Sequence, residues 1–167
     1  MKKYSSNIEI MFLIFGIIFF IGIIIFLFTG FTKVMYGKYV GDLVNKLFEF
    51  SNAVKLQNKN VIEKEIYLDK ESLEAFYITK NVLYLPFDVD CTGEAPYFVI
   101  KLKKTSWKNI PEKMKEKFRK NALCISIGDE ERVKIDKSCE HIEIGKTYKL
   151  VSILETTGDK KLECMEV

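Results

Sequence analysis

Residues 10–32 read IMFLIFGIIFFIGIIIFLFTGFT, a stretch without a single charged side chain. A helix rises about 1.5 Å per residue, so about 20 apolar residues cross the hydrocarbon layer of a bilayer. A secretory signal peptide has an apolar region of only about 7–15 residues, followed by a small-residue cleavage site. Here the apolar stretch is longer, and TGFTK at residues 29–33 is a poor cleavage site. The sequence therefore predicts a retained transmembrane helix over residues 10–32, preceded by a short basic leader or cytoplasmic N-terminus at residues 1–9.

Apolar residues continue beyond this helix, but on one face only. They recur at steps of three and four residues, the spacing of one side of a helix, at Val40, Leu43, Val44, Leu47, Phe48 and Val54. The first proline is Pro86, so no proline interrupts this pattern, and the polar residues 57–60 follow it. The sequence predicts an amphipathic helix over residues 33–58 that continues the transmembrane helix.

The rest of the chain, residues 59–167, is typical of β-strands joined by polar loops. Strands are expected at residues 61–68, 76–78, 82–85, 98–102, 148–154 and 162–167, with 148–154 in the centre of the sheet and 162–167 closing it. Residues 124–127 and 133–135 flank a turn that begins at Gly128 and predict a hairpin.

A short helix is expected to begin at Asn109, with Pro111 in its first turn and Glu112 as its capping partner. Its narrow apolar stripe would be Met114, Phe118 and Ala122. The predicted fold class is α+β: a single long N-terminal transmembrane helix continuing as an amphipathic helix, then a mainly antiparallel β-sheet head with one or two short helices.

All four cysteines lie beyond the apolar stretch, at Cys91, Cys124, Cys139 and Cys164. No two are separated by only two residues, so their spacing is not that of a zinc ribbon or a thioredoxin-type pair. An even number in a small membrane-tethered domain favours disulfides in an oxidising compartment, and three pairings stay open. The alternative is four free thiols in a cytosolic domain.

Orientation depends on this choice, because the basic residues flanking the helix are balanced. Lys2 and Lys3 precede it, and Lys33 and Lys38 follow it, so the positive-inside rule is nearly silent. The cysteines favour an N-terminus inside the cell and an extracytoplasmic head at residues 59–167.

Glu9 stands at the start of the apolar stretch, in the sequence SSNIEI at residues 5–10. At this point the chain resembles archaeal type IV pilins and pilin-like proteins, in which a basic leader precedes a mature start whose fifth residue is glutamate. By this resemblance Lys2 and Lys3 match the leader, Ser5 would be the first mature residue, and Glu9 the fifth. Tyr4 stands where the family's peptidase prefers glycine or alanine. The resemblance leaves open either atypical processing between Tyr4 and Ser5 or a retained leader.

The resemblance implies an assembly role for Glu9, which would set the register of packed helices by pairing with the amino terminus of a neighbouring subunit. Such a pair is strong where water is excluded. The alternative is that Glu9 is a hydrated residue at the membrane interface beside a plain anchor.

Positive charge is concentrated in residues 101–120, where many lysines and Arg119 oppose only Glu112 and Glu116. The predicted basic surface is made by Lys113, Lys115, Lys117, Arg119 and Lys120. Its partner could be anionic lipid headgroups, an acidic protein or DNA phosphates, and the alternative is a solvated helix face. Because the formal net charge of the chain is only +3, a dedicated nucleic-acid binder is not expected.

Residues 88–93 (DVDCTG) resemble the opening of a calcium loop, but Val99 stands where that loop needs a bidentate glutamate. No metal or cofactor is therefore expected. Cys139 and His141 would share one face of a strand, yet the chain has no G-x-S-x-G, phosphate loop or H-E-x-x-H motif. An enzyme is not expected.

Together these features predict a structural subunit of a cell-surface filament or secretion-type assembly, polymerising through its N-terminal apolar helix. Its partners would be membrane lipid and either further copies of the chain or other pilin-like subunits. It would lie in the cell membrane as a single-pass protein or, once assembled, in an extracellular filament. The alternative is a single-pass, membrane-anchored binding module that forms no filament.

Overall fold

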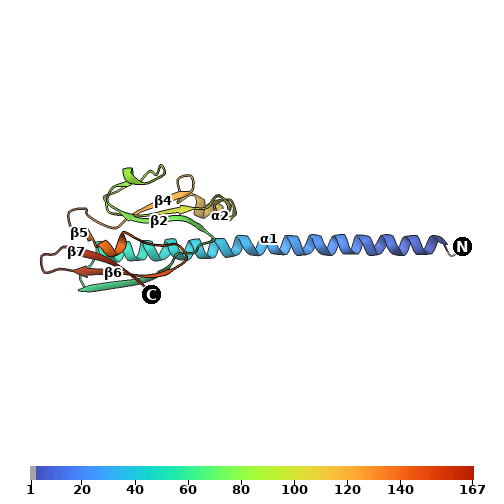
Figure 1. Cartoon of the computed structure of the whole chain (residues 1–167), viewed down its shortest axis with the longest axis horizontal. Helices are drawn as coiled ribbons and strands as arrows, with labels where there is room; N and C mark the ends of the chain where they lie inside the picture. Colours follow the sequence, from blue (N-terminus) through green and yellow to red (C-terminus); the bar gives the residue numbers. More distant parts are fainter. Residues whose placement is uncertain (1–2) are drawn as a thin grey trace. The chain divides into compact units, whose positions relative to one another are not determined.

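The computed structural model describes the backbone of residues 3–167 and the side chains of residues 10–31 and 34–167. One long helix begins the chain, and β-strands with short helices follow it (Figure 1). In chain order the elements are α1 (Lys3–Lys55), β1 (Val61–Tyr67), β2 (Leu73–Thr79), η1 (Val82–Tyr84), β3 (Tyr97–Leu102), α2 (Lys104–Asn109), α3 (Glu112–Lys115), β4 (Ala122–Ser126), β5 (Val133–Ile135), η2 (Lys137–Cys139), β6 (Thr147–Leu154) and β7 (Lys160–Glu166). The predicted α+β class is confirmed.

By packing, the chain divides into two compact units, the first ending at Met35 and the second being Tyr36–Val167. We call the second unit the head. Helix α1 contributes to both units. The head thus includes residues 36–58 of the amphipathic helix that the sequence predicted over residues 33–58, and residues 33–35 belong to the first unit.

The first unit is the apolar part of α1. Between Ile10 and Phe31 its large apolar side chains are 39–76% exposed. Exposure on all sides is unfavourable in water, but it is without cost where the surroundings are lipid chains. Within the described part of the chain, α1 is the one helix long and apolar enough to cross a membrane. It has the length and composition of a single-pass membrane anchor.

The head is built around the C-terminal part of α1. The apolar side chains that this part buries are Val40, Leu43, Val44, Leu47, Phe50 and Val54. The predicted face is correct except at Phe48, whose side chain is 36% exposed. Phe50 is buried instead, with its ring 6.1 Å from that of Phe98. Successive helix residues point about 100° apart, so Phe48 is carried off the face that Leu47 and Phe50 share.

Two sheets enclose this helical segment. One has the order β1-β6-β7-β5 and the other β2-β3-β4, and Figure 1 shows the C-terminal part of α1 running between them. Pairing is antiparallel except between β5 and β7, so the sheets are mainly antiparallel, as predicted. Side chains from both sheets and from α1 form one core.

Polar contacts fix the end of α1 to both sheets. Ser51, 1% exposed, donates its hydroxyl hydrogen to the carbonyl oxygen of Ser126 at 2.6 Å. Lys160 on β7 donates to the carbonyl oxygen of Val54, one of the groups that a helix leaves unpaired at its C-terminus. The hydroxyl of Ser152 on β6 donates to the Gln57 side chain at 2.6 Å. These bonds hold α1 in one register against the strands.

The predicted hairpin of residues 124–127 and 133–135 is wrong. Strand β4 pairs with β3 in one sheet, whereas β5 pairs in parallel with β7 in the other. Ile127 and Val133 are both buried in the shared core, at 0% and 2% exposure. The turn that begins at Gly128 therefore crosses between sheets instead of closing a hairpin.

The predicted strand at residues 82–85 is also wrong, because a short 3-10 helix, η1, stands there. Asn81 accepts the backbone N–H of Leu83 at 3.0 Å through its side-chain oxygen. This local bond offers the backbone an alternative to a sheet ladder and overrides the β-propensity of the residues. Strand β6 is central as predicted, whereas β7 lies between β6 and β5 and does not close the sheet.

The predicted helix start at Asn109 is wrong, because Asn109 is the last residue of α2. The next residue, Ile110, adopts an extended conformation, as expected before a proline. Pro111 caps α3 without a side-chain hydrogen bond. Ala122, predicted at the end of a helical stripe, instead begins β4.

Candidate interaction surfaces

The anchor surface consists of the apolar side chains of residues 10–31. A methyl group added at Gly16, Gly22 or Gly30 would meet no atom within 4 Å. The space beside these glycines is therefore open to lipid or to another helix. The predicted assembly residue Glu9 and the predicted processing residues Tyr4 and Ser5 lie outside the side chains that the structure describes.

The four cysteines form two disulfides, Cys91–Cys124 and Cys139–Cys164. Disulfides were predicted, and the structure selects this pairing from the three that the sequence left open. The first links the loop before β3 to β4, and the second links η2 to β7. Two structural disulfides favour an oxidising compartment for the head.

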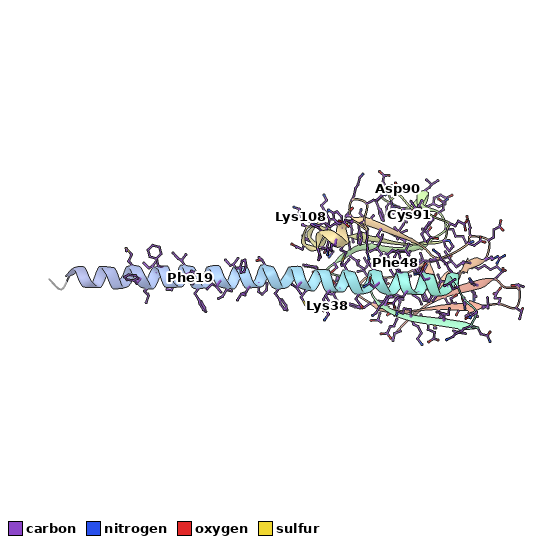
Figure 2. All side chains as sticks on the ribbon, turned by 180° about the vertical axis from the view of Figure 1, so that it is seen from behind. Phe19, Lys38, Phe48, Asp90, Cys91 and Lys108 are labelled. Atoms are coloured by element: carbon purple, nitrogen blue, oxygen red, sulfur yellow. A yellow bond between two sulfur atoms is a disulfide. The ribbon has the colours of Figure 1, made fainter. Side chains whose placement is uncertain are left out.

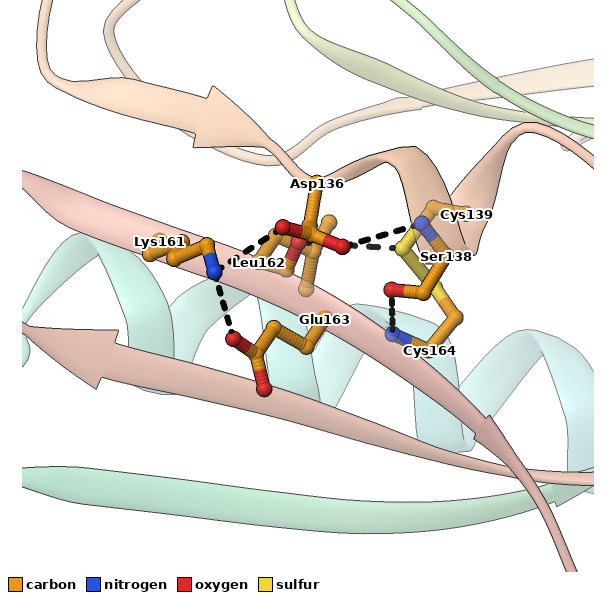
Figure 3. Close-up of polar contacts among 7 residues, drawn as sticks. All are labelled: Asp136, Ser138, Cys139, Lys161, Leu162, Glu163 and Cys164. Atoms are coloured by element: carbon orange, nitrogen blue, oxygen red, sulfur yellow. Dashed lines mark hydrogen bonds and ion pairs between the residues drawn. A yellow bond between two sulfur atoms is a disulfide. The ribbon is translucent and has the colours of Figure 1, made fainter.

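Polar groups surround the second disulfide (Figure 3). Asp136 accepts the backbone N–H of Ser138 at 2.9 Å, and its other oxygen lies 2.9 Å from the Lys161 ammonium. Ser138 in turn accepts the backbone N–H of Cys164 at 3.1 Å. The hydrogen bond from Ser138, followed by the interaction with Lys161, lowers the pKa of Asp136 from its ordinary 3.8 to about 2. The cluster fixes η2 onto β7.

Cys139 and Asp90, which the sequence offered for catalysis and calcium binding, have other partners in the structure. Cys139 lies in a disulfide, so its thiol cannot act as a nucleophile beside His141. Asp90 forms an ion pair with Arg119. Among the residues that the structure describes, no group of histidine, cysteine, aspartate and glutamate side chains is arranged to hold a metal ion.

Several members of the predicted basic surface already have partners in the chain. Lys115 pairs with Glu112 at 2.6 Å, and Arg119 pairs with Asp90. The Lys117 ammonium lies 5.6 Å from the centre of the Phe48 ring. These contacts partly neutralise the C-terminal end of the segment.

Other lysines of the same region have no such partner. Lys104, Lys108, Lys113 and Lys120 are exposed and form no ion pair with any side chain in the described part of the chain. The unpaired charge therefore gathers on α2 and α3. The predicted surface omitted Lys104 and Lys108, although both lie within the basic stretch that the sequence displayed.

A groove of about 1250 Å³ lies beside β4 in the head. Its walls are formed by α1 residues 45–55, by β4, by the turn that begins at Gly128, and by the loop at residues 92–94. Lys55 and Arg132 contribute exposed cations, and Lys160 lies among them. Burial, followed by repulsion from Arg132, lowers the pKa of Lys160.

The free edge of β4 faces this groove. Two hydrogen bonds at the ends of the β3–β4 pairing show its pattern: the N–H of Ile127 donates to the carbonyl oxygen of Pro96, and the N–H of Leu102 donates to the carbonyl oxygen of Asn121. In an antiparallel ladder hydrogen-bonded pairs alternate with non-bonded pairs, so Cys124 and Ser126 direct their backbone groups away from β3.

Part of that edge is already occupied. The N–H and the carbonyl of Ala122 both form hydrogen bonds with the backbone of Arg119, and the Ser126 carbonyl accepts the hydroxyl hydrogen of Ser51. The N–H and carbonyl of Cys124 and the N–H of Ser126 remain directed toward the groove, where an extended segment could pair with them.

Sequence reasoning missed this groove. One signal was present, because Ser51 is a polar residue on the apolar face of the amphipathic helix, between Leu47 and Val54. A buried polar residue requires a hydrogen-bond partner. The partner itself, a strand-edge carbonyl 75 residues away in the chain, could not be read from the pattern.

Comparison of the chain with protein-family models, with curated proteins and with solved structures finds no match.

Proposed function

We propose that the chain is a pilin-like structural subunit of a cell-surface filament or secretion-type assembly, anchored in the membrane by α1 and polymerising through it. The observation that carries the proposal is the anchor surface. Its large apolar side chains are at least 39% exposed from Ile10 to Phe31, so it requires a covering that the described chain does not provide. Lipid covers it in the membrane, and the same surfaces of other subunits would cover it in a filament.

The construction of the head supports a structural role. The helix that carries the anchor surface also forms the centre of the head core. A subunit that polymerises through its apolar helix needs a head that remains folded when the helix changes surroundings. Two disulfides and the bonds at the end of α1 serve that need.

Glu9 has a specific role under this proposal. An unpaired carboxylate in apolar surroundings is costly, so it needs a cation when helices pack together. Cleavage after Tyr4 would create a new amino terminus at Ser5, four residues from Glu9 in the chain. A neighbouring subunit could offer that ammonium group and so fix the register between helices.

The test combines N-terminal mass analysis of the native protein with electron microscopy of membrane and shed fractions. We expect the mature chain to begin at Ser5 and the shed fraction to contain polymers. Glu9→Gln should reduce polymer yield while leaving the protein in the membrane. Glu140→Gln, at an exposed head position, is the matched control and should polymerise normally. A native protein that retains Met1 and yields no polymer would contradict the proposal.

The groove beside β4 favours a second candidate function, a membrane-anchored binding module in the extracytoplasmic space. An extended peptide from a partner would add a strand to β4 by pairing with Cys124 and Ser126. Thr92→Trp would place a large side chain at the groove, because Thr92 is exposed and lines it. Two results together would favour the module over the filament subunit. The unmodified chain would bind a component of envelope extracts that this variant does not bind, and neither the unmodified chain nor the variant would polymerise.

A further inference from the structure

The start of α3 packs against the part of α1 that begins the head. A methyl added at Gly37 would lie 3.0 Å from Pro111, and one at Gly41 would lie 2.9 Å from the Met114 side chain. A side chain at Gly37 would require Pro111 to move by a few tenths of an ångström, whereas one at Gly41 would meet the flexible end of Met114. Figure 1 shows α2 beside this stretch of α1.

This packing limits the distance between the basic segment and the membrane. Gly37 follows Phe31, the last large apolar residue of the anchor surface, by six positions. Six residues span at most about 21 Å in any conformation, whatever the relative orientation of the two units. The headgroup layer itself extends about 5–7 Å beyond the hydrocarbon. The segment that packs on Gly37 is therefore held near the membrane surface.

The order of contacts shows which lysines lie nearest. Pro111 meets Gly37, Met114 meets Gly41, and Lys117 lies over Phe48, so the segment proceeds away from the anchor along α1. Lys113 thus lies at the Gly37 end of this segment, and α2, which carries Lys104 and Lys108, directly precedes it in the chain. Figure 2 shows Lys108 at the same end of the head as Lys38.

We propose that Lys104, Lys108 and Lys113 bind the anionic phospholipid headgroups of the membrane that holds α1. All three are exposed and without an ion pair in the described part of the chain, whereas Lys115 and Arg119 farther along the segment have acidic partners and Lys117 faces the groove. Lys120 is also exposed and unpaired, but it lies beyond α3. The proposal rests on the membrane anchor, which both candidate functions share, and not on filament formation.

Electrostatics and composition agree with this partner. An anionic leaflet attracts each nearby lysine enough to change a docking equilibrium about fivefold, so three lysines change it about 100-fold. Trp107 lies in the same segment, half-buried against Phe118 with ring centres 6.1 Å apart. Tryptophan is favoured at membrane interfaces because its ring is amphipathic.

Trp107, the single tryptophan of the chain, is the probe for the test. The full chain is placed in nanodiscs of phosphatidylcholine, with and without phosphatidylglycerol, that contain a trace of lipid carrying a nitroxide on its headgroup. We expect stronger quenching of Trp107 in the anionic discs, and we expect high salt to remove the difference. The variant K104E/K108E/K113E should lower the docked-to-undocked ratio at least 100-fold and remove the difference as well.

The matched control is K59E/K80E/K137E, three exposed lysines elsewhere on the head that form no ion pair with the described side chains. It changes net charge equally and should keep the difference between the two discs. Near-UV circular dichroism of each variant verifies that the head is folded.

Equal quenching in neutral and anionic discs would overturn the headgroup contact alone. An equal loss in the control variant would also overturn it, since net charge would then suffice. A shift of Trp107 emission by a DNA duplex, with equal quenching in both discs, would assign the lysines to nucleic acid instead. A chain that fails to enter discs would overturn the anchor and the headgroup contact together.

Discussion

Removing the C-terminal part of α1 should unfold the head. Two water-soluble fragments test this: residues 36–167, which keep the helical segment, and residues 59–167, which keep every strand but lose it. The amphipathic pattern alone would permit the shorter fragment to fold, with the helix acting only as a stalk. The structure instead places the helix between the two sheets.

The magnitude follows from the side chains that would be lost. Six apolar side chains of α1 are at most 4% exposed in the head, namely Val40, Leu43, Val44, Leu47, Phe50 and Val54. Burying each contributes about 1.5–3 kcal/mol, so together they contribute about 9–18 kcal/mol. A domain of this size has a net free energy of unfolding of only about 5–15 kcal/mol. The two disulfides cannot compensate, because the facing sheets would be left without a common core.

The assay is thermal unfolding followed by near-UV circular dichroism, with both fragments oxidised. We expect a cooperative transition for residues 36–167 and none for residues 59–167. Adding a synthetic peptide of residues 36–58 to the shorter fragment should restore some native signal. The reasoning is refuted if the shorter fragment unfolds cooperatively with the same spectrum as the longer one.

Four further variants test the same structure in the full chain. Phe50→Ala should destabilise the head by about 3–5 kcal/mol in urea, because a buried aromatic side chain is removed, whereas Phe48→Ala should cost less than about 1 kcal/mol; equal costs would contradict the assigned helix face. The double variant C139S/C164S should lose about 3.5 kcal/mol of unfolding free energy, the loop-closure value for a sequence separation of 25. An unchanged midpoint of urea unfolding would contradict this. The pKa of Asp136 is lowered from 3.8 to about 2, so the stability it contributes is fully present above about pH 4 and is lost as the pH falls toward 2. In a plot of the thermal unfolding midpoint against pH, Asp136→Asn should therefore flatten the decrease below about pH 4. An unchanged decrease would count against the pairing with Lys161.

The anchor and the amphipathic face could be predicted because both depend on local periodicity. An uninterrupted apolar run and a repeat of three and four residues are properties of single helices, and single helices are readable from sequence. Phe48 shows the limit of this reading. Two aromatic residues two positions apart, Phe48 and Phe50, differ in direction by about 200°, and small shifts of the assumed face exchange them.

Strand partnerships could not be predicted, because they depend on contacts between distant residues. The hairpin expected around Gly128 satisfied local rules for turns, yet Ile127 and Val133 are each buried more effectively by separate sheets. The disulfide pairing and the groove share this dependence. Cys124 had three candidate partners in the sequence, and only the placement of the loop containing Cys91 selects one.

The basic surface illustrates an intermediate case. The run of positive charge was plain in the sequence, and the prediction placed the basic surface at its C-terminal end. There the fold partly neutralises the charge, because Lys115 pairs with Glu112 and Arg119 pairs with Asp90. The proposed headgroup contact depends on the packing of Pro111 and Met114 against Gly37 and Gly41, which no local pattern predicts. Function at this surface follows from where the fold carries the charge.

The filament and headgroup proposals describe two states of one subunit that exclude each other. Under the headgroup proposal, the anchor surface would lie in lipid and Lys104, Lys108 and Lys113 would contact headgroups. In a filament that surface is covered by other subunits, and the lysines lose their lipid partners, at a cost of about 1 kcal/mol each. Apolar packing between anchors is insensitive to salt at physiological concentrations, whereas the headgroup contacts weaken as ionic strength rises. Under both proposals, ionic strength and the anionic lipid content of the membrane would set how readily the subunit leaves the bilayer.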